Sequence, residues 1–319
     1  MRVCRYQDDS GVQVGFYADD TVVSLAAAAE RYQQSSGETL SFSNTQDLLA
    51  LLPAGGADHQ AAQQLSSWLT DQGDAETADI RQATDSIQLL VPLPRPNKLF
   101  LLAGNYAKHI EEGGEIAAER AETFPYVFMK PPTTTLTNPG QPIKIPTVNP
   151  NSTDYELELA IIIGRGGKGI AEADALDHVA GFTIINDISD RKFRPNSNRK
   201  ERTKDGFFDW LHGKWHDSFC PCGPCITSRD AIADPQQLKL TLSVNGEVRQ
   251  DSSTAHQIFP VAAVIEFISS FVTLEPGDII STGTPAGVGN TTGTYLQPGD
   301  QIEAAISEIG SLRSPVEAE

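Results

Sequence analysis

The segment TDYELELAIIIG (residues 153–164) places two glutamates at the start of a strongly apolar run. Its β-branched residues predict a strand, in which successive side chains point to opposite faces. Glu156 and Glu158 then point to one face, and Leu157 and Leu159 point to the other. Two carboxylates beside a buried strand repel each other and lose hydration. The segment therefore predicts a cation or a shared proton at this position.

A third carboxylate follows another apolar run, HVAGFTIINDISDR (residues 178–191), where Asp187 comes directly after Asn186. Three oxygen ligands without histidine or cysteine suit Mg²⁺, Mn²⁺ or Ca²⁺ better than zinc. The alternative is that the Glu-x-Glu pair lies on the solvated face of an edge strand, where alternating polar residues are common. The sequence alone leaves both interpretations open.

The composition excludes several classes of partner. The chain has 319 residues, of which 42 are acidic and 24 are Lys or Arg, giving a formal net charge of −18. Because no basic stripe interrupts this acidity, we expect no nucleic-acid and no membrane partner. The acidity itself indicates solubility or a saline habitat. The first residues lack a signal-peptide pattern, and no segment approaches the ~20 apolar residues of a membrane span, so we expect a cytoplasmic protein.

Proline residues divide the chain into two regions. In VPLPRPNKLF (residues 91–100), alternate prolines predict a stiff connection, so we expect a small N-terminal α+β domain (1–95) and a catalytic domain (96–319). The second region is rich in short β segments separated by Pro-Gly turns, with one long helix within 255–271. The predicted fold class is α+β, mostly β. In the first region the patterns predict strands near 2–6, 12–17 and 21–24, and helices near 25–32, 45–52 and 59–69.

Three further segments carry candidate chemistry. In AGNYAKHIEEGGE (residues 103–115), a helical turn would let Glu112 orient His109 as a base, and the two following glycines would let the segment move as a lid. In WLHGKWHDSF (210–219), Lys214 could stabilise an enolate. STGTPAGVG (281–289) is typical of an anion-binding loop but lacks the lysine of a nucleotide site. The alternatives are an idle histidine and a lysine paired at the surface.

Three of the four cysteines are in CPCGPC (residues 220–225), and the fourth is Cys4. The prolines and glycine predict a tight turn with small buried thiols, although a zinc or redox site is the alternative.

The order of these motifs strongly resembles the fumarylacetoacetate hydrolase family over roughly residues 97–316. The matching stretches are GNYAKHIEE, FMKPPTTTLTNPGQPI, DYELELAIIIG, HVAGFTIINDISDR, GKWHDSFCPCGP, VNGEVRQDSST and LEPGDIISTGTPAGVG. The resemblance implies a mixed β-roll, a homodimer, a Mg²⁺ or Mn²⁺ site and activity on small anionic 2-oxo acids or diketones. It also implies residue roles: Glu156, Glu158 and Asp187 as metal ligands, His109 and Glu112 as a lid dyad, Lys214 as charge stabiliser, and Arg191, Thr284 and Lys130 near the substrate.

Two departures from the family pattern leave the substrate open. Trp215 and His216 stand where many members have Ser-Phe, and Arg194 stands where several have a substrate-contacting glutamine. The basic residues within 191–204 indicate either an acidic substrate tail or a solvated charged loop.

The resemblance leads us to expect a divalent-metal-dependent hydrolase that cleaves a carbon–carbon bond in a diketo acid or acylpyruvate. A 2-oxo-acid decarboxylase or isomerase, or a ureido-acid lyase, could use the same metal site. A ligand-binding dimer without catalysis is the alternative from a different class, and the retained carboxylates argue against it.

Overall fold

The computed structural model describes residues 1–319, and sheets dominate it. The largest sheet has twelve strands. Its main path runs in the order β4 (Arg81–Ala83), β3 (Thr21–Ser24), β2 (Gly11–Ala18), β1 (Arg2–Asp8), β14 (Cys220–Ser228), β12 (Val179–Asn186), β11 (Leu157–Ile163), β17 (Ile279–Ser281), β6 (Leu99–Ala103) and β7 (Tyr126–Met129). Beside this path, β5 (Gln88–Leu90) pairs with β1, and β8 (Leu136–Thr137) pairs with β14.

Two smaller sheets complete the β structure. The five-stranded sheet has the order β16 (Glu247–Ser253), β15 (Lys239–Val244), β18 (Gln301–Ile306), β19 (Gly310–Ala318) and β9 (Ile143–Ile145). The short strands β10 (Thr153–Asp154) and β13 (Ser189–Asp190) pair with each other. The expected α+β fold, mostly β, is confirmed.

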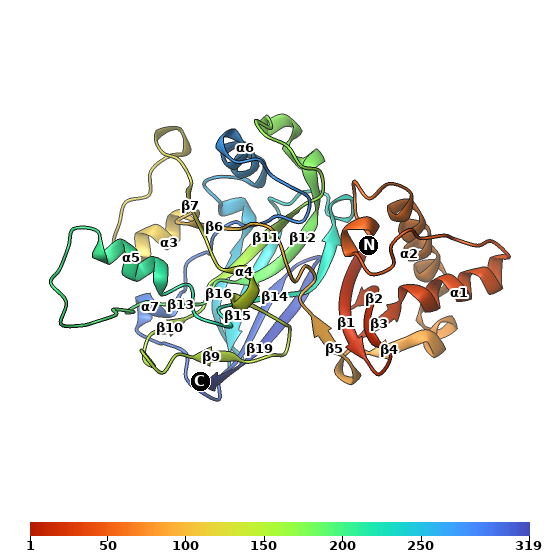
Figure 1. Cartoon of the computed structure of the whole chain (residues 1–319), viewed down its shortest axis with the longest axis horizontal. Coiled ribbons are helices and arrows are strands. Elements are labelled where there is room, and N and C mark those ends of the chain that lie inside the picture. Colours follow the sequence, from red (N-terminus) through yellow and green to blue (C-terminus); the bar gives the residue numbers. More distant parts are fainter.

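The helices lie at the ends and over the faces of the sheets. They are α1 (Leu25–Ser36), α2 (Gly56–Glu76), α3 (Ala107–Glu112), α4 (Pro132–Thr135), α5 (Asp205–His212), α6 (Val261–Phe271) and α7 (Gly289–Thr292). Short 3₁₀ turns are η1 (Leu48–Leu51), η2 (Ala78–Ile80), η3 (Thr84–Ser86), η4 (Arg120–Glu122), η5 (Glu172–His178), η6 (Arg229–Ala231) and η7 (Thr254–His256). Figure 1 shows α1 and α2 at one end of the molecule and α3, α5 and α7 at the other. None of these helices combines the length and apolar character needed to cross a bilayer.

The N-terminal region follows its sequence pattern with one exception. The three predicted strands are β1, β2 and β3, and the helices predicted near 25–32 and 59–69 are α1 and α2. The predicted helix at 45–52 is wrong, since only the 3₁₀ turn η1 forms there. Pro53 disfavours helical geometry at Leu52, which is extended with φ −103° and ψ 167°.

Residues 1–95 extend the main sheet of the chain. Strand β1 pairs antiparallel with β14, matching Arg2 to Thr227 and Val3 to Ile226. One apolar core joins Val3 and Leu65 to Ala160 and Ile185 of the central strands. The division at residue 95 stays a prediction about independently folding units.

Strand β11 explains the apolar run that follows the glutamates. It lies between β12 and β17, and all of its residues are buried. Leu159 and Ile161 pack into one core, whereas Ala160 and Ile162 pack into the other. Because both faces of the strand are covered, its side chains are apolar on both faces and do not alternate between apolar and polar. Glu158 lies two residues before Ala160 and therefore on the same face.

The expected tight turn at CPCGPC is wrong, because these residues begin the nine-residue strand β14. Pro221 and Pro224 are accommodated there beside a register shift between β12 and β14. All four cysteines are free and buried, and burial raises the pKa of Cys222 and Cys225 to about 12. Their environment is that of small structural thiols.

Candidate active site and metal centre

The strand register brings three carboxylates together. Leu157 of β11 pairs with Asn186 of β12 and Glu158 pairs with Ile185, so Asp187 lies opposite Glu156 and diagonally across from Glu158. The backbone N–H of Asp187 donates to the Glu156 carbonyl at 2.8 Å. One oxygen from each of the three carboxylates lies within 4.8 Å of the others, and all three residues are buried. The solvated edge-strand alternative is therefore excluded.

Glu158 is incompletely paired. Its Oε2 accepts hydrogen bonds from the Ser281 hydroxyl at 2.5 Å and the Gly283 N–H at 2.9 Å, while its buried Oε1 has no partner. Burial raises the pKa of Glu158 well above its usual range, and the Asp187 and Glu156 carboxylates raise it further. A buried, unpartnered oxygen in an oxygen-only donor set fits a hard divalent cation.

Two buried lysines balance part of this charge. Lys214 Nζ donates to Glu156 at 2.9 Å, to Asp187 at 2.6 Å and to Ser189 at 2.9 Å, which uses all three of its protons. Burial lowers the pKa of Lys214, but the two carboxylates outweigh this and raise it, so the ammonium stays charged. Lys130 donates its hydrogen bonds to the backbone carbonyls of Ile188 and Phe219. Its ammonium group also forms an ion pair with Asp187 Oδ1, but the geometry of that pair is not that of a hydrogen bond.

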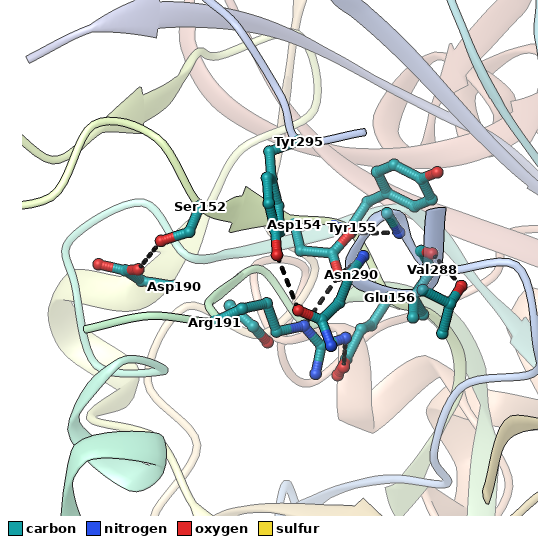
Figure 2. Close-up of polar contacts among 12 residues, drawn as sticks. Ser152, Asp154, Tyr155, Glu156, Asp190, Arg191, Val288, Asn290 and Tyr295 are labelled. Atoms are coloured by element: carbon teal, nitrogen blue, oxygen red, sulfur yellow. Dashed lines mark hydrogen bonds and ion pairs between the residues drawn. The ribbon is translucent and has the colours of Figure 1, made fainter. Parts of the chain in front are cut away.

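Asp154 is a buried acid beside the cluster that the sequence analysis did not single out. Figure 2 shows Arg191 and Asn290 converging on it. Arg191 Nε donates to Asp154 Oδ2 at 2.8 Å, and the guanidinium also forms an ion pair with Glu156. Burial opposes ionisation of Glu156, but Arg191 and Lys214 lower its pKa below the usual range. The alternation of Asp154, Glu156 and Glu158 was the available signal, because its first acid points the same way as the other two.

The cluster has a nearly balanced charge. Counted as ionised, the four carboxylates Asp154, Glu156, Glu158 and Asp187 face the three cations Lys130, Lys214 and Arg191, which leaves one negative charge. A divalent cation would change this to one positive charge and would favour an anionic ligand.

The His109–Glu112 pair forms as predicted on α3. His109 Nδ1 lies 2.8 Å from Glu112 Oε1, and Glu112 Oε2 accepts the Gly287 N–H at 2.9 Å. Burial would raise the pKa of Glu112, but hydrogen bonds from His109 and Gly287 lower it below its usual value. An ionised Glu112 accepts the Nδ1 proton, which leaves Nε2 of His109 as the basic nitrogen.

The glycine-rich loop binds the chain's own carboxylates. Backbone N–H groups within 283–290 donate to Glu158, Glu112 and Asp154 at 2.7–3.0 Å. The loop approaches other backbone so closely that a Cβ on Gly287, whose φ is +104°, would lie 2.1 Å from the Arg249 carbonyl oxygen. One loop therefore links the carboxylate cluster, the dyad and the Asp154 anchor.

A cavity of about 1120 Å³ lies at this end of the molecule, and His109 and Arg191 are on its wall. Arg191 connects the cavity to the carboxylates, since its guanidinium contacts Glu156. All the lining residues belong to the region after residue 99, so the N-terminal region contributes none of the wall.

Of the nine site residues that the resemblance implies, only His109 and Arg191 line the cavity, and the three carboxylates, Glu112 and Lys214 lie behind its wall. Lys130 is fully buried, and Thr284 accepts a hydrogen bond from Gln250 at 2.8 Å, without lining the cavity. Trp215 and His216 do not line it either; Trp215 donates to the Met129 carbonyl at 2.9 Å.

Three basic residues of the loop 191–204 pair with nearby acids of the loop or of α5. Arg194 pairs with Glu201 at 2.5 Å, and Arg199 and Arg202 pair with Asp205 at 3.1 and 2.9 Å. Of its basic residues only Arg191 lines the cavity, so the geometry favours the charged-loop interpretation over an acidic substrate tail.

The comparisons with known proteins agree with this architecture. The family model for the fumarylacetoacetate hydrolase C-terminal domain matches residues 98–317. The chain is 39% identical over 259 residues to oxaloacetate tautomerase YisK of Bacillus subtilis, covering 80% of this chain and 81% of that protein. It is 36% identical over 258 residues to the mitochondrial oxaloacetate tautomerase fahd2 of Xenopus laevis, covering 77% and 76%.

A solved structure extends the likeness to the whole chain. Maleylpyruvate hydrolase from Sphingobium sp. SYK-6, in complex with manganese(II) and pyruvate, matches with a TM-score of 0.71 and 27% identity, covering 100% of this chain and 99% of that one. The matched domain contains the carboxylate cluster, the dyad and the cavity described above. The chain belongs to the fumarylacetoacetate hydrolase family.

Proposed function

We propose that this protein is a divalent-metal-dependent enzyme that acts on a small 2-oxo acid through its enol form, with keto–enol tautomerisation of oxaloacetate as its first reaction to test. The main observation behind this proposal is that backbone N–H groups of one loop bind both Glu112, the partner of His109, and Glu158 of the carboxylate cluster, beside a cavity that His109 lines. The oxaloacetate tautomerases among its relatives support this choice of reaction.

Glu156, Glu158 and Asp187 would hold the cation, because they supply clustered oxygen ligands and one of them has a free buried oxygen. Mg²⁺ or Mn²⁺ is the proposed ion, and Ca²⁺ also fits the donor chemistry. A bound divalent ion supplies Lewis-acid stabilisation of a developing enolate. The manganese in the related maleylpyruvate hydrolase structure supports the assignment.

His109 is the proposed base. Its Nε2 removes a proton from the carbon next to the keto group, and the electron pair of that C–H bond becomes the enolate double bond. Returning the proton to the enolate oxygen completes tautomerisation. Glu112 keeps Nδ1 as the donor, and the same pair can return the proton in the opposite direction.

Arg191 is the proposed contact for the substrate carboxylate, because it lines the cavity and is held from behind by Asp154. Lys214 donates its three protons to Glu156, Asp187 and Ser189 in this structure. Its proposed role is therefore to stabilise negative charge through these groups without touching the substrate. Lys130 orients Asp187, and Thr284 supports the glycine-rich loop through Gln250.

Hydrolytic cleavage of an acylpyruvate is the second candidate. The cavity of about 1120 Å³ favours it, because a four-carbon acid would fill only part of that space. His109 would then take a proton from water as the hydroxyl attacks the distal carbonyl. Breaking the adjacent carbon–carbon bond would release a carboxylic acid and the enolate of pyruvate, which takes up a proton.

The test is a panel of oxaloacetate and acylpyruvates with Mg²⁺, with Mn²⁺ and with chelator. Loss of the enol absorbance reports tautomerisation, and pyruvate release reports cleavage. Metal-dependent acceleration of oxaloacetate tautomerisation supports the first candidate, and metal-dependent cleavage alone supports the second. Metal-independent rates for both would contradict the proposal.

The expected homodimer stays a prediction, which sedimentation of the purified protein would test.

A further inference from the structure

Building on the proposed function, we infer that the outer part of the active-site cavity binds an apolar substrate tail, so that the preferred 2-oxo acid carries an aryl or alkyl group. The cavity is lined by 28 residues, of which 18 are hydrophobic. A cavity of about 1120 Å³ exceeds the space of about 300–1000 Å³ that is typical for drug-sized ligands. A small diacid alone would leave most of this apolar wall in contact with water.

Aromatic rings form the outer wall. Phe124 stacks on Phe267 with centroids 6.1 Å apart, and Tyr126 and Phe271 meet these two rings edge to face at 5.4 and 5.2 Å. The lining side chains are nevertheless solvent-accessible: Phe124 is 58% exposed and Phe271 is 56% exposed. Exposed aromatic residues clustered around a cavity are typical of a binding site, whereas the aromatic residues of a hydrophobic core are buried.

A second aromatic wall joins this outer part to the reaction centre. Trp210 packs edge to face on Phe128 at 5.1 Å, and Phe207 lies 5.7 Å from Trp210. Lys214 Nζ lies 5.0 Å from the Phe128 ring and 5.7 Å from the Trp210 ring. The rings that line the cavity therefore contact the lysine that pairs with Glu156, so the apolar wall is continuous with the reaction centre.

The charge of the wall excludes an acidic tail. The only acidic or basic side chains on the wall are His109, Glu115 and Arg191. His109 and Arg191 are the proposed base and the proposed contact for the substrate's 2-oxo-acid group, and the third residue, Glu115, is itself an acid. A second carboxylate in the outer part would lose hydration without gaining a cation, whereas an aryl or alkyl group would bury against the rings.

The experiment compares three 2-oxo acids with one head group: acetylpyruvate, benzoylpyruvate and fumarylpyruvate. Calorimetric binding with Mg²⁺ and kcat/KM are both measured. Phe207→Ser is the test variant, because Phe207 lines the cavity and is 55% exposed. Phe208→Ser is the matched control, since Phe208 is the next residue of α5, is 43% exposed and does not line the cavity. Phe124→Ser tests the aromatic group around Phe267, which includes no residue of α5.

Benzoylpyruvate is expected to bind roughly tenfold tighter or better than acetylpyruvate, and fumarylpyruvate is expected to gain nothing. Phe207→Ser and Phe124→Ser should each weaken benzoylpyruvate binding several-fold more than acetylpyruvate binding, while Phe208→Ser keeps the full difference between the two ligands. Equal binding of acetylpyruvate and benzoylpyruvate would overturn the inference. So would test variants that weaken self-association in sedimentation without changing tail preference, because a second copy would then occupy the wall.

The binding measurement needs no turnover. A protein that prefers benzoylpyruvate but fails to tautomerise oxaloacetate or cleave acylpyruvates would refute the proposed function and keep the tail site. Metal-dependent tautomerisation of oxaloacetate without a preference for benzoylpyruvate would support the proposed function and refute the apolar tail site.

Discussion

Asp154 Oδ2 accepts a hydrogen bond of 2.8 Å from Arg191 Nε, and the same carboxylate accepts the backbone N–H groups of Gly289 and Asn290 at 2.7 and 3.0 Å. A fully buried acid thus fixes both the cation that lines the cavity and the loop that holds Glu112. This relationship makes Asp154 a positioning residue, since it reaches the substrate only through Arg191.

Asp154→Asn should raise KM for an anionic substrate roughly ten- to a hundredfold, because a hydrogen bond to a charged group contributes about 1.5–3 kcal/mol. Asparagine loses the negative charge and keeps only one acceptor oxygen, so it can no longer accept on both sides from Arg191 Nε and from the loop N–H groups. Mg²⁺ affinity should change much less, which calorimetry checks. Asp190→Asn removes another buried carboxylate, whose hydrogen-bond partners are Asn149, Ser152 and the Lys192 N–H and not the Arg191 guanidinium, so it controls for general destabilisation. An unchanged KM in Asp154→Asn would refute the positioning role.

His109→Ala should lower kcat by roughly 10²–10⁴-fold while metal content stays constant, because the base is lost and the ligands are intact. Steady-state kinetics and metal analysis provide the measurement. His256→Ala is the control, since His256 is exposed and does not line the cavity. Retention of most of the activity in His109→Ala would exclude the dyad as the base.

Glu158→Gln should weaken Mg²⁺ binding without lowering the stability of the metal-free protein. Without metal, the buried carboxylate is destabilised by burial and by Asp187 and Glu156, so the neutral amide should keep or raise the melting temperature. Its oxygen can still accept from Ser281 and Gly283. The rise in Tm on adding Mg²⁺ should largely disappear, as affinity falls about tenfold or more. A full Mg²⁺-induced rise in the variant would place the cation elsewhere.

Asp58 gives a pH-dependent stability prediction. Hydrogen bonds from the Ser43 hydroxyl and from the Ser43 and Asn44 backbone N–H groups lower its pKa. A lowered native pKa contributes stability that is full above the unfolded value of about 3.9 and is lost as pH falls through the native pKa. Asp58→Asn should therefore reduce the free energy of unfolding at pH 7, and the difference from wild type should shrink in acid. Urea titrations at both pH values test this, and a difference independent of pH would contradict it.

The main strands and the carboxylate cluster could be predicted because their signals are local. Alternation placed Glu156 and Glu158 on one face, and a second apolar strand ending at Asp187 supplied the third oxygen. The pairing of β1 with β14 had no such signal, because it joins residues more than two hundred positions apart.

The roles of Lys130, Thr284 and the glycine-rich loop depended on tertiary contacts. The resemblance implies that Lys130 and Thr284 lie near the substrate, which stays a prediction, and the structure adds that Lys130 pairs with Asp187 and that Thr284 accepts from Gln250. The loop has the composition of an anion-binding loop without the lysine of a nucleotide site, and the anions that it binds are carboxylates of the same chain. Such partners emerge only when distant segments meet.

The most direct test of the central claim is hydrogen exchange at the carbon next to the keto group of oxaloacetate, followed by NMR in ²H₂O. The wild-type protein with Mg²⁺ should accelerate this exchange, and either chelator or His109→Ala should remove the acceleration. Exchange that persists at the wild-type rate without metal, or without the His109 imidazole, would contradict an enol-forming site built from the cluster and the dyad.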